Sequence, residues 1–180
     1  TVTKTAVATG AELVGYSGFS ASNYLLLPAG VFDANDITFS INTWIKTPSL
    51  SHVGIFISTG EESASHLRSA FLDSTRELKI ANWANDFSTG YIVPVDVWTH
   101  VVVNYIRTAT NTYTLYVYVN GGFVASNTFS TLSTFTNTAW DIGGGTRTAP
   151  RHFAGSISLM RLSATAPTAE QITKMYNDEK

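Results

Sequence analysis

The chain has 180 residues, a formal net charge of −2, and only 13% charged residues. It therefore has no basic surplus to neutralise nucleic-acid phosphates, and no charge block typical of a membrane-surface helix. Cysteine is absent, which excludes disulfides and thiolate metal sites. No apolar run is long enough to span a bilayer, so we expect neither a nucleic-acid partner nor membrane insertion.

The length suits one domain over residues 1–180, and the content of aromatic residues, Thr and Ser favours strands. Alternation over Thr1–Ala8 predicts an edge strand, or an arm at residues 1–10 that pairs with another chain. A loop over Gly10–Gly18 and a short apolar run at Tyr24–Leu27 follow. Because the chain does not begin with Met or a signal segment, we expect a removed leader or a piece of a longer protein.

Strands separated by polar turns are expected along most of the remaining chain. Their ranges are Ile37–Lys46, His52–Ser58, His66–Asp73, Glu77–Trp83, Tyr91–Val93, Trp98–Ile106, Tyr113–Asn120, Phe123–Phe129, Trp140–Ile142 and Phe153–Leu162. Asn85–Gly90 is expected to be a loop. In Phe153–Leu162 both registers leave a mixed face, so the pattern does not decide which side chains enter the core.

The central feature is a predicted β-hairpin of Trp98–Ile106 and Tyr113–Asn120, joined by the polar segment Arg107–Thr112. Side chains alternate across a strand, which assigns one face of each strand to the core. The expected core residues are Val101, Val103, Tyr105, Leu115, Val117 and Val119. The opposite faces carry His100, Asn104, Tyr116 and Tyr118, which form either cross-strand aromatic pairs or a ligand-binding surface.

One short helix is expected at residues 167–177. Thr168 and Gln171 have the spacing of a capping box, and Ile172, Met175 and Tyr176 lie on one helical face. Many short strands and one terminal helix predict an all-β, two-sheet antiparallel β-sandwich, or jelly roll, with a short C-terminal helix.

Four stretches follow a pattern shared by a known family. They are ITFSINTWIKT at Ile37–Thr47, WTHVVVNY at Trp98–Tyr105, LYVYVNG at Leu115–Gly121, and FAGSISLMRLSATAPTAEQI at Phe153–Ile172. In order and spacing they resemble the laminin-G-like branch of the concanavalin A-like lectin/glucanase superfamily, although the third stretch has two extra residues. The resemblance implies a concanavalin A-like jelly roll but leaves the function open, because this fold serves many roles.

Glucanases of this superfamily carry a Glu-x-Asp-x-Glu run, and this chain has none. The adjacent pair Glu61-Glu62 would point to opposite faces of a strand, so it cannot place two carboxylates about 5 Å apart. The histidines lack a serine-elbow or cysteine partner pattern. We therefore expect no catalytic residues and no enzyme activity.

Relatives in the superfamily often bind calcium through Asp and Asn oxygens at the rim of a sheet. The densest group of this kind is Asp33, Asn35 and Asp36, and Asn85 with Asp86 is a second. Local hydrogen bonding in turns is the alternative explanation for both groups. No cofactor is required by the pattern, and Ca²⁺ is the candidate cation.

Two aromatic sets are candidate carbohydrate sites, because aromatic faces beside amide and imidazole groups suit sugar rings. One comprises Asn42, Trp44, His100, Asn104, Tyr116 and Tyr118. The other comprises Trp83, Asn85, Phe87 and Tyr91, with Asp86 in the same loop.

These sets predict a non-catalytic recognition or adhesion module that binds a glycan or cell-surface ligand. The resemblance implies that it belongs to a larger extracellular, secreted or virion-surface protein. The alternative is a structural fibre or capsid-decoration domain whose N-terminal arm pairs with a neighbouring chain. A glycosidase is the third and weakest interpretation.

Overall fold

The computed structural model describes residues 1–6, 14–35, 37–60, 63, 66–82, 85–134, 136, 139–144 and 151–180. The strands are β1 (Thr3–Ala6), β2 (Val14–Ser17), β3 (Leu25–Leu27), β4 (Phe39–Lys46), β5 (Gly54–Gly60), β6 (Leu67–Leu72), β7 (Glu77–Ala81), β8 (Phe87–Ile92), β9 (Thr99–Ala109), β10 (Thr112–Val119), β11 (Gly122–Phe129), β12 (Trp140–Ile142) and β13 (Ser156–Ser163). The helix α1 spans Ala169–Glu179. Among the described residues, no helix combines the length and apolarity needed to cross a membrane.

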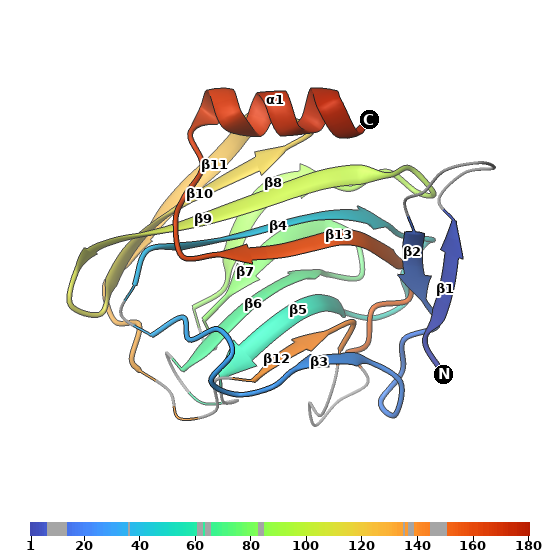
Figure 1. Cartoon of the computed structure of the whole chain (residues 1–180), viewed down its shortest axis with the longest axis horizontal. Helices are drawn as coiled ribbons and strands as arrows, with labels where there is room; N and C mark the ends of the chain where they lie inside the picture. The colour runs from blue at the N-terminus through green and yellow to red at the C-terminus, as the bar shows by residue number, and fades with distance from the viewer. Residues whose placement is uncertain are drawn as a thin grey trace.

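The strands form two antiparallel sheets that pack face to face, with α1 over the outer face of one of them (Figure 1). The first sheet has the order β1-β2-β13-β4-β9-β10-β11, and the second has the order β3-β12-β5-β6-β7-β8. The apolar core lies between them and includes Phe39, Phe56, Leu78, Trp140 and Phe153, all fully buried. The expected β-sandwich with a terminal helix is therefore confirmed.

The central hairpin has the predicted faces. Its six expected core residues are at most 5% exposed. Its second turn is also as expected, because Asn120 and Gly121 both adopt positive φ, at 50° and 79°. The first turn is tighter than predicted, because β9 continues to Ala109 and β10 starts at Thr112.

Strand β13 explains why its sequence fits neither register. Ser158 pairs with Trp44 but Arg161 pairs with Asn42, so the strand contains a β-bulge, and Leu159 within it has a φ of 49°. The bulge reverses the alternation, and Ile157 before it and Leu162 after it both pack on the core.

Other boundaries differ from the sequence prediction. Strand β2 lies in the expected loop Gly10–Gly18, where four residues including Gly15 give too short a pattern to detect. Strand β8 begins at Phe87 rather than Tyr91, so most of the expected loop Asn85–Gly90 is extended. The helix is confirmed with its capping box, shifted two residues toward the C-terminus.

Candidate functional site

The first predicted ligand surface is largely covered by α1. Trp44 stacks on Tyr176 with ring centroids 5.7 Å apart, and its Nε1 donates a hydrogen bond of 2.8 Å to Glu179 Oε2. Asn104 Nδ2 donates to the carbonyl of Pro167, which leads into the helix. Asn42, with an exposed fraction of 5%, donates to Met175 Sδ.

His100 lies beneath the same helix and is fully buried. Its Nε2 is 3.0 Å from Asn42 Oδ1, and its Nδ1 has no hydrogen-bonding partner. Burial lowers the pKa of His100 to about 4, so the ring is neutral at neutral pH. With α1 docked, Trp44, His100 and Asn104 are at most 7% exposed, while Asn42 lines a groove beside the helix together with Arg161 and Met175. The role of these four residues as a ligand site stays a prediction.

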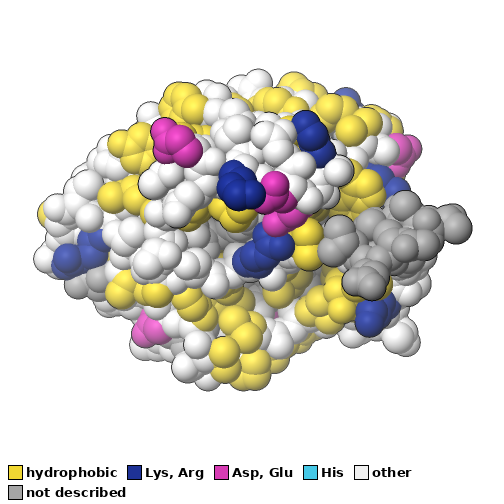
Figure 2. Space-filling model, turned by 45° about the horizontal axis from the view of Figure 1, so that its top comes forward, with side chains coloured by type: hydrophobic (Ala, Val, Ile, Leu, Met, Phe, Trp, Pro, Cys, Tyr) yellow, Lys and Arg dark blue, Asp and Glu magenta, His cyan; other side chains and the backbone are white. Residues whose placement is uncertain are grey.

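The outer surface on the α1 side has no single-sign electrostatic field. Figure 2 shows scattered charges of both signs, with hydrophobic side chains between them. Arg161 pairs with Glu179, and Lys174 pairs with Asp178, each at 2.6 Å. This surface therefore lacks the basic stripe expected of a nucleic-acid interface.

Tyr116 and Tyr118 remain accessible beside the helix. Both lie on the outer face of β10, next to Phe123 of the neighbouring strand β11. The ring centroid of Phe123 is 6.5 Å from that of Tyr116 and 5.8 Å from that of Tyr118. Phe123 is 58% exposed and Tyr116 is 37% exposed. The structure thus separates these two tyrosines from the rest of their predicted set and joins them to Phe123, which the sequence analysis had not included.

The second predicted set is also divided. Phe87 and Tyr91 point inward from β8 and pack on the core, because they alternate with the exposed Ser88 and Gly90. Asn85 is exposed and lines a surface hollow described below. Trp83 lies outside the described residues.

The predicted calcium group shows local hydrogen bonding where it can be described. The backbone N–H of Asn35 donates to Asp33 Oδ1 at 2.8 Å, which is the turn interaction expected as the alternative. Asp36 lies outside the described residues. Within the described part of the chain no three His, Cys, Asp or Glu residues are grouped as metal ligands, and calcium binding stays a prediction.

A hollow of about 270 Å³ opens on the outer face of the six-stranded sheet, and we call it the β5–β7 hollow. Its lining includes Ile55, Leu67, Ser69, Phe71, Asp86 and Arg151. Strand register builds the floor, because Ile55 pairs with Phe71 and Ser69 pairs with Ala81. Ile55, Leu67, Phe71 and Ala81 form an apolar cluster separate from the main core.

Polar groups lie in and around this apolar floor. Ser69 is fully buried, and its Oγ has no hydrogen-bonding partner. Arg151 is held against β5, because its carbonyl accepts a hydrogen bond of 2.7 Å from Ile55 N–H. Asp86 and Arg151 carry opposite charges and both line the hollow. Partial burial raises the pKa of the Asp86 carboxyl, and the positive charges of Lys79 and Arg151 act in the opposite direction. The hollow thus offers an apolar wall together with donors and acceptors.

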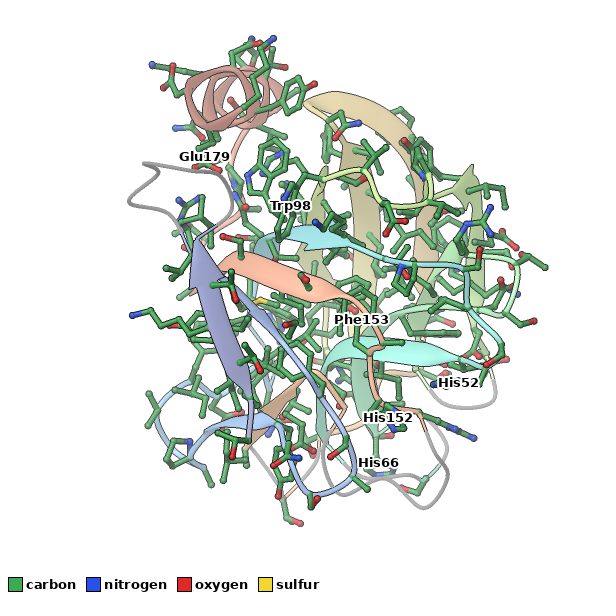
Figure 3. All side chains as sticks on the ribbon, turned by 90° about the vertical axis from the view of Figure 1, so that its right-hand side faces the viewer. His52, His66, Trp98, His152, Phe153 and Glu179 are labelled. Atoms are coloured by element: carbon green, nitrogen blue, oxygen red, sulfur yellow. The ribbon has the colours of Figure 1, made fainter. Side chains whose placement is uncertain are left out.

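Arg151 is followed in the chain by His152, whose ring contacts the ring of His52. The rings of His52 and His152 lie side by side with centroids 5.1 Å apart, near the end of the molecule opposite Glu179 and α1 (Figure 3). Ile55 and His152 form an isolated parallel bridge, which fixes this segment beside β5. The β5–β7 hollow and the helix-covered face therefore belong to different sheets.

A second hollow of about 380 Å³ adjoins the first, and we call it the β11 hollow. Its lining includes Asn82, Asn85, Asp86, Asn127, Ser130 and Thr131. Asp86 lines both hollows. Asn82 is 1% exposed, and its Oδ1 has no hydrogen-bonding partner. Two adjoining hollows each contain a buried polar atom that a bound group can satisfy.

The β5–β7 hollow was not predicted, although the sequence of β6 contains a signal for it. In β6 the outward Leu67 and Phe71 flank Ser69, and the inward Ala70 and Leu72 follow Arg68, so both faces carry large apolar side chains. An antiparallel sandwich strand normally has one polar face. Apolar residues on both faces indicate that something covers or binds the outer one.

The two sheets, their strand order and the terminal helix define a jelly-roll domain of the concanavalin A-like type. A laminin G family model, described as the concanavalin A-like lectin/glucanases superfamily, matches residues 19–173. The chain belongs to this superfamily, which confirms the resemblance seen in the sequence. A comparison with curated proteins found no match.

Several solved structures share the fold at low sequence identity. Domain 4 of AbnA, a GH43 extracellular arabinanase from Geobacillus stearothermophilus in complex with arabinotriose, is 21% identical with a TM-score of 0.69, over 98% of this chain and 81% of that chain. A putative carbohydrate binding protein from Bacteroides ovatus is 18% identical with a TM-score of 0.65, over 87% of this chain and 46% of that chain. Trypanosoma rangeli sialidase is 13% identical with a TM-score of 0.66, over 93% of this chain and 30% of that chain. The chain thus spans less than half of the last two proteins.

Proposed function

We propose that this chain is a non-catalytic carbohydrate-binding domain of a larger extracellular protein, and that the β5–β7 hollow is its binding site. The observation that carries the proposal is the buried, unpartnered Ser69 Oγ on an otherwise apolar floor. A sugar presents C–H groups on one face and hydroxyls at its edge, so it can cover the apolar floor and bond the polar atoms together.

Two of the structural neighbours support this proposal. One neighbour is described with arabinotriose bound and as extracellular, and another is described as a putative carbohydrate binding protein. A non-catalytic role fits the missing Glu-x-Asp-x-Glu run. Strand β1 pairs with β2 of its own chain at the edge of the seven-stranded sheet, so the fibre alternative is left with the outer edge of β1 as its pairing surface.

Calorimetric titration with a set of neutral glycans tests the proposal. The set contains arabinotriose, xylotriose, cellobiose and N,N′-diacetylchitobiose, and at least one should bind. Arg151→Ala should weaken that binding at least tenfold, while Asn177→Ala on the exposed face of α1 should not change it. No binding by any glycan, or turnover of a glycan by the protein, would contradict the proposal.

Tyr116→Ala distinguishes the hollow from the exposed aromatic group of Tyr116, Tyr118 and Phe123. If the hollow is the site, this variant should bind like the wild type, because these rings lie on the other sheet. Loss of binding in Tyr116→Ala with normal binding in Arg151→Ala would move the site to the aromatic group.

A further inference from the structure

We propose that the β5–β7 hollow binds the acetamido group of one sugar unit and that the β11 hollow binds the neighbouring unit, so that the ligand is an N-acetylated oligosaccharide of at least two units. This inference rests on the proposed carbohydrate-binding function and adds the chemical class of the ligand. Its basis is the contrast between two hollows that meet at Asp86.

The apolar floor of the β5–β7 hollow suits a methyl group better than a sugar hydroxyl. Ile55, Leu67 and Phe71 are at most 7% exposed and form one continuous cluster on its floor. A hydroxyl pressed against this cluster would lose its bonds to water and gain none in return. A methyl group is the part of a sugar derivative that such a floor accommodates best.

The polar atoms of the same hollow select an amide over a bare methyl. Arg151 supplies N–H donors, Asp86 supplies carboxylate acceptors, and the unpartnered Ser69 Oγ can donate or accept. An acetamido group has one carbonyl acceptor and one N–H donor beside its methyl, so it can use the floor and both kinds of partner. A 6-deoxy sugar has a methyl group but no amide directly attached to it, so only ring hydroxyls farther from that methyl could bond these polar atoms.

The charges favour a neutral ligand. Asp86 and Arg151 line the hollow together, so a sugar carboxylate attracted by the guanidinium would also meet the carboxylate of Asp86. Like charges at close range are unfavourable in a partly buried site. An uncharged amide avoids this repulsion.

The β11 hollow has the opposite character. Amide and hydroxyl side chains dominate its lining, including Asn82, Asn85, Asn127 and Ser130. Such groups exchange hydrogen bonds with sugar hydroxyls, and the unpartnered Asn82 Oδ1 provides a buried acceptor. Asp86 lines both hollows, so a disaccharide bound across Asp86 would place one unit in each.

Calorimetry of the whole chain with three matched sugars tests the inference. N,N′-diacetylchitobiose differs from cellobiose only in its two acetamido groups, and N-acetylglucosamine is its single unit. We expect diacetylchitobiose to bind at least tenfold more tightly than cellobiose and at least fivefold more tightly than N-acetylglucosamine. Equal affinity for diacetylchitobiose and cellobiose would overturn the assignment of the acetamido group, and equal affinity for diacetylchitobiose and N-acetylglucosamine would overturn the two-hollow arrangement.

Two variants assign the effects to their hollows. Arg151→Ala should reduce the preference for diacetylchitobiose over cellobiose to less than threefold. Asn127→Ala, which changes a half-buried side chain, should remove the preference for the disaccharide over N-acetylglucosamine and leave the affinity for N-acetylglucosamine unchanged. Unchanged preferences in both variants would contradict the inference, and Asn177→Ala is the control.

Failure of this inference can be separated from failure of the proposed function. If arabinotriose or xylotriose binds through the hollow while the acetylated sugars do not, the domain binds carbohydrate and the acetamido assignment is wrong. If no glycan binds, both are wrong.

Discussion

Trp44 Nε1 and Glu179 Oε2 form a hydrogen bond of 2.8 Å that joins the central strand β4 to the last turn of α1. The same carboxylate accepts from Arg161 of β13 through its other oxygen. The two donors hold the helix end over the polar face of the seven-stranded sheet, and thereby turn a potential binding surface into an internal contact.

Trp44→Phe should lower the free energy of unfolding by about 1.5–3 kcal/mol, because it removes a donor to a charged and largely buried acceptor while keeping an aromatic ring. Equilibrium urea unfolding measures this change. Glu179→Gln leaves one acceptor oxygen for two donors and removes the ion pair with Arg161, so this variant should also be destabilised. A Trp44→Phe protein as stable as the wild type would show that the contact does not hold the helix.

His100 should make stability depend on pH. Its pKa is lowered to about 4 by burial, while an unfolded histidine titrates near 6.5. The unfolded chain therefore binds the proton first, so this contribution is complete above pH 6.5 and is lost as pH falls from 6.5 toward 4. The full loss amounts to up to about 3 kcal/mol.

Comparing His100→Gln with the wild type isolates this effect from the carboxylates that titrate in the same range. The difference in unfolding free energy between the two proteins, measured from pH 7.5 to pH 4, should shrink as pH falls. A constant difference across this range would mean that His100 is not buried in the neutral form.

Gly155 lies where β13 approaches β4. A Cβ added at this position would collide with the backbone carbonyl of Lys46 and with the ring of Phe153. Because a backbone atom cannot move aside, Gly155→Ala should cost about 1–3 kcal/mol in thermal or urea unfolding. Gly122→Ala is the matched control, since its Cβ would meet only the carbonyl of Val119 at 3.6 Å, and similar losses in both variants would contradict the assignment.

Thr168 caps α1 by accepting a hydrogen bond from Gln171 N–H, and Gln171 Oε1 accepts one from Thr168 N–H in return. Thr168→Ala should destabilise the protein by about 1 kcal/mol, and Thr168→Ser should restore most of that loss. Hydrogen exchange of the α1 amides is the sensitive measurement. Faster exchange confined to α1 in the alanine variant supports the capping role, and unchanged exchange would oppose it.

The parts of the fold that could be predicted from sequence depend on local patterns. The core face of the central hairpin follows a regular alternation, and its residues are buried as expected: Val101, Val103, Leu115 and Val117. The start of the helix was predictable because Thr168 has the spacing to Gln171 that a capping box requires. Strand β13 resisted prediction because its bulge at Leu159 reverses the alternation within one strand. A period-two pattern cannot represent that reversal.

The candidate site was less predictable, because it depends on which elements meet. The polarity of Asn42, His100 and Asn104 suggested a ligand surface. These residues are instead covered by α1 and the segment leading into it, which lie more than fifty residues later in the sequence. Ser69 and Arg151 are far apart in sequence and become neighbours only through the pairing of the segment around His152 with β5. Of the predicted loop, Asn85 and Asp86 line the β11 hollow, and their role in binding stays a prediction.

The most direct test of the central claim is a two-dimensional ¹H–¹⁵N NMR titration of the chain with the tightest-binding glycan of the set named above. We predict chemical-shift changes centred on the amides of Ser69, Phe71, Ala81 and Asp86, with the α1 amides unaffected. Changes confined to Tyr116, Tyr118 and Phe123, or no changes with any of the glycans, would contradict the β5–β7 hollow as the binding site.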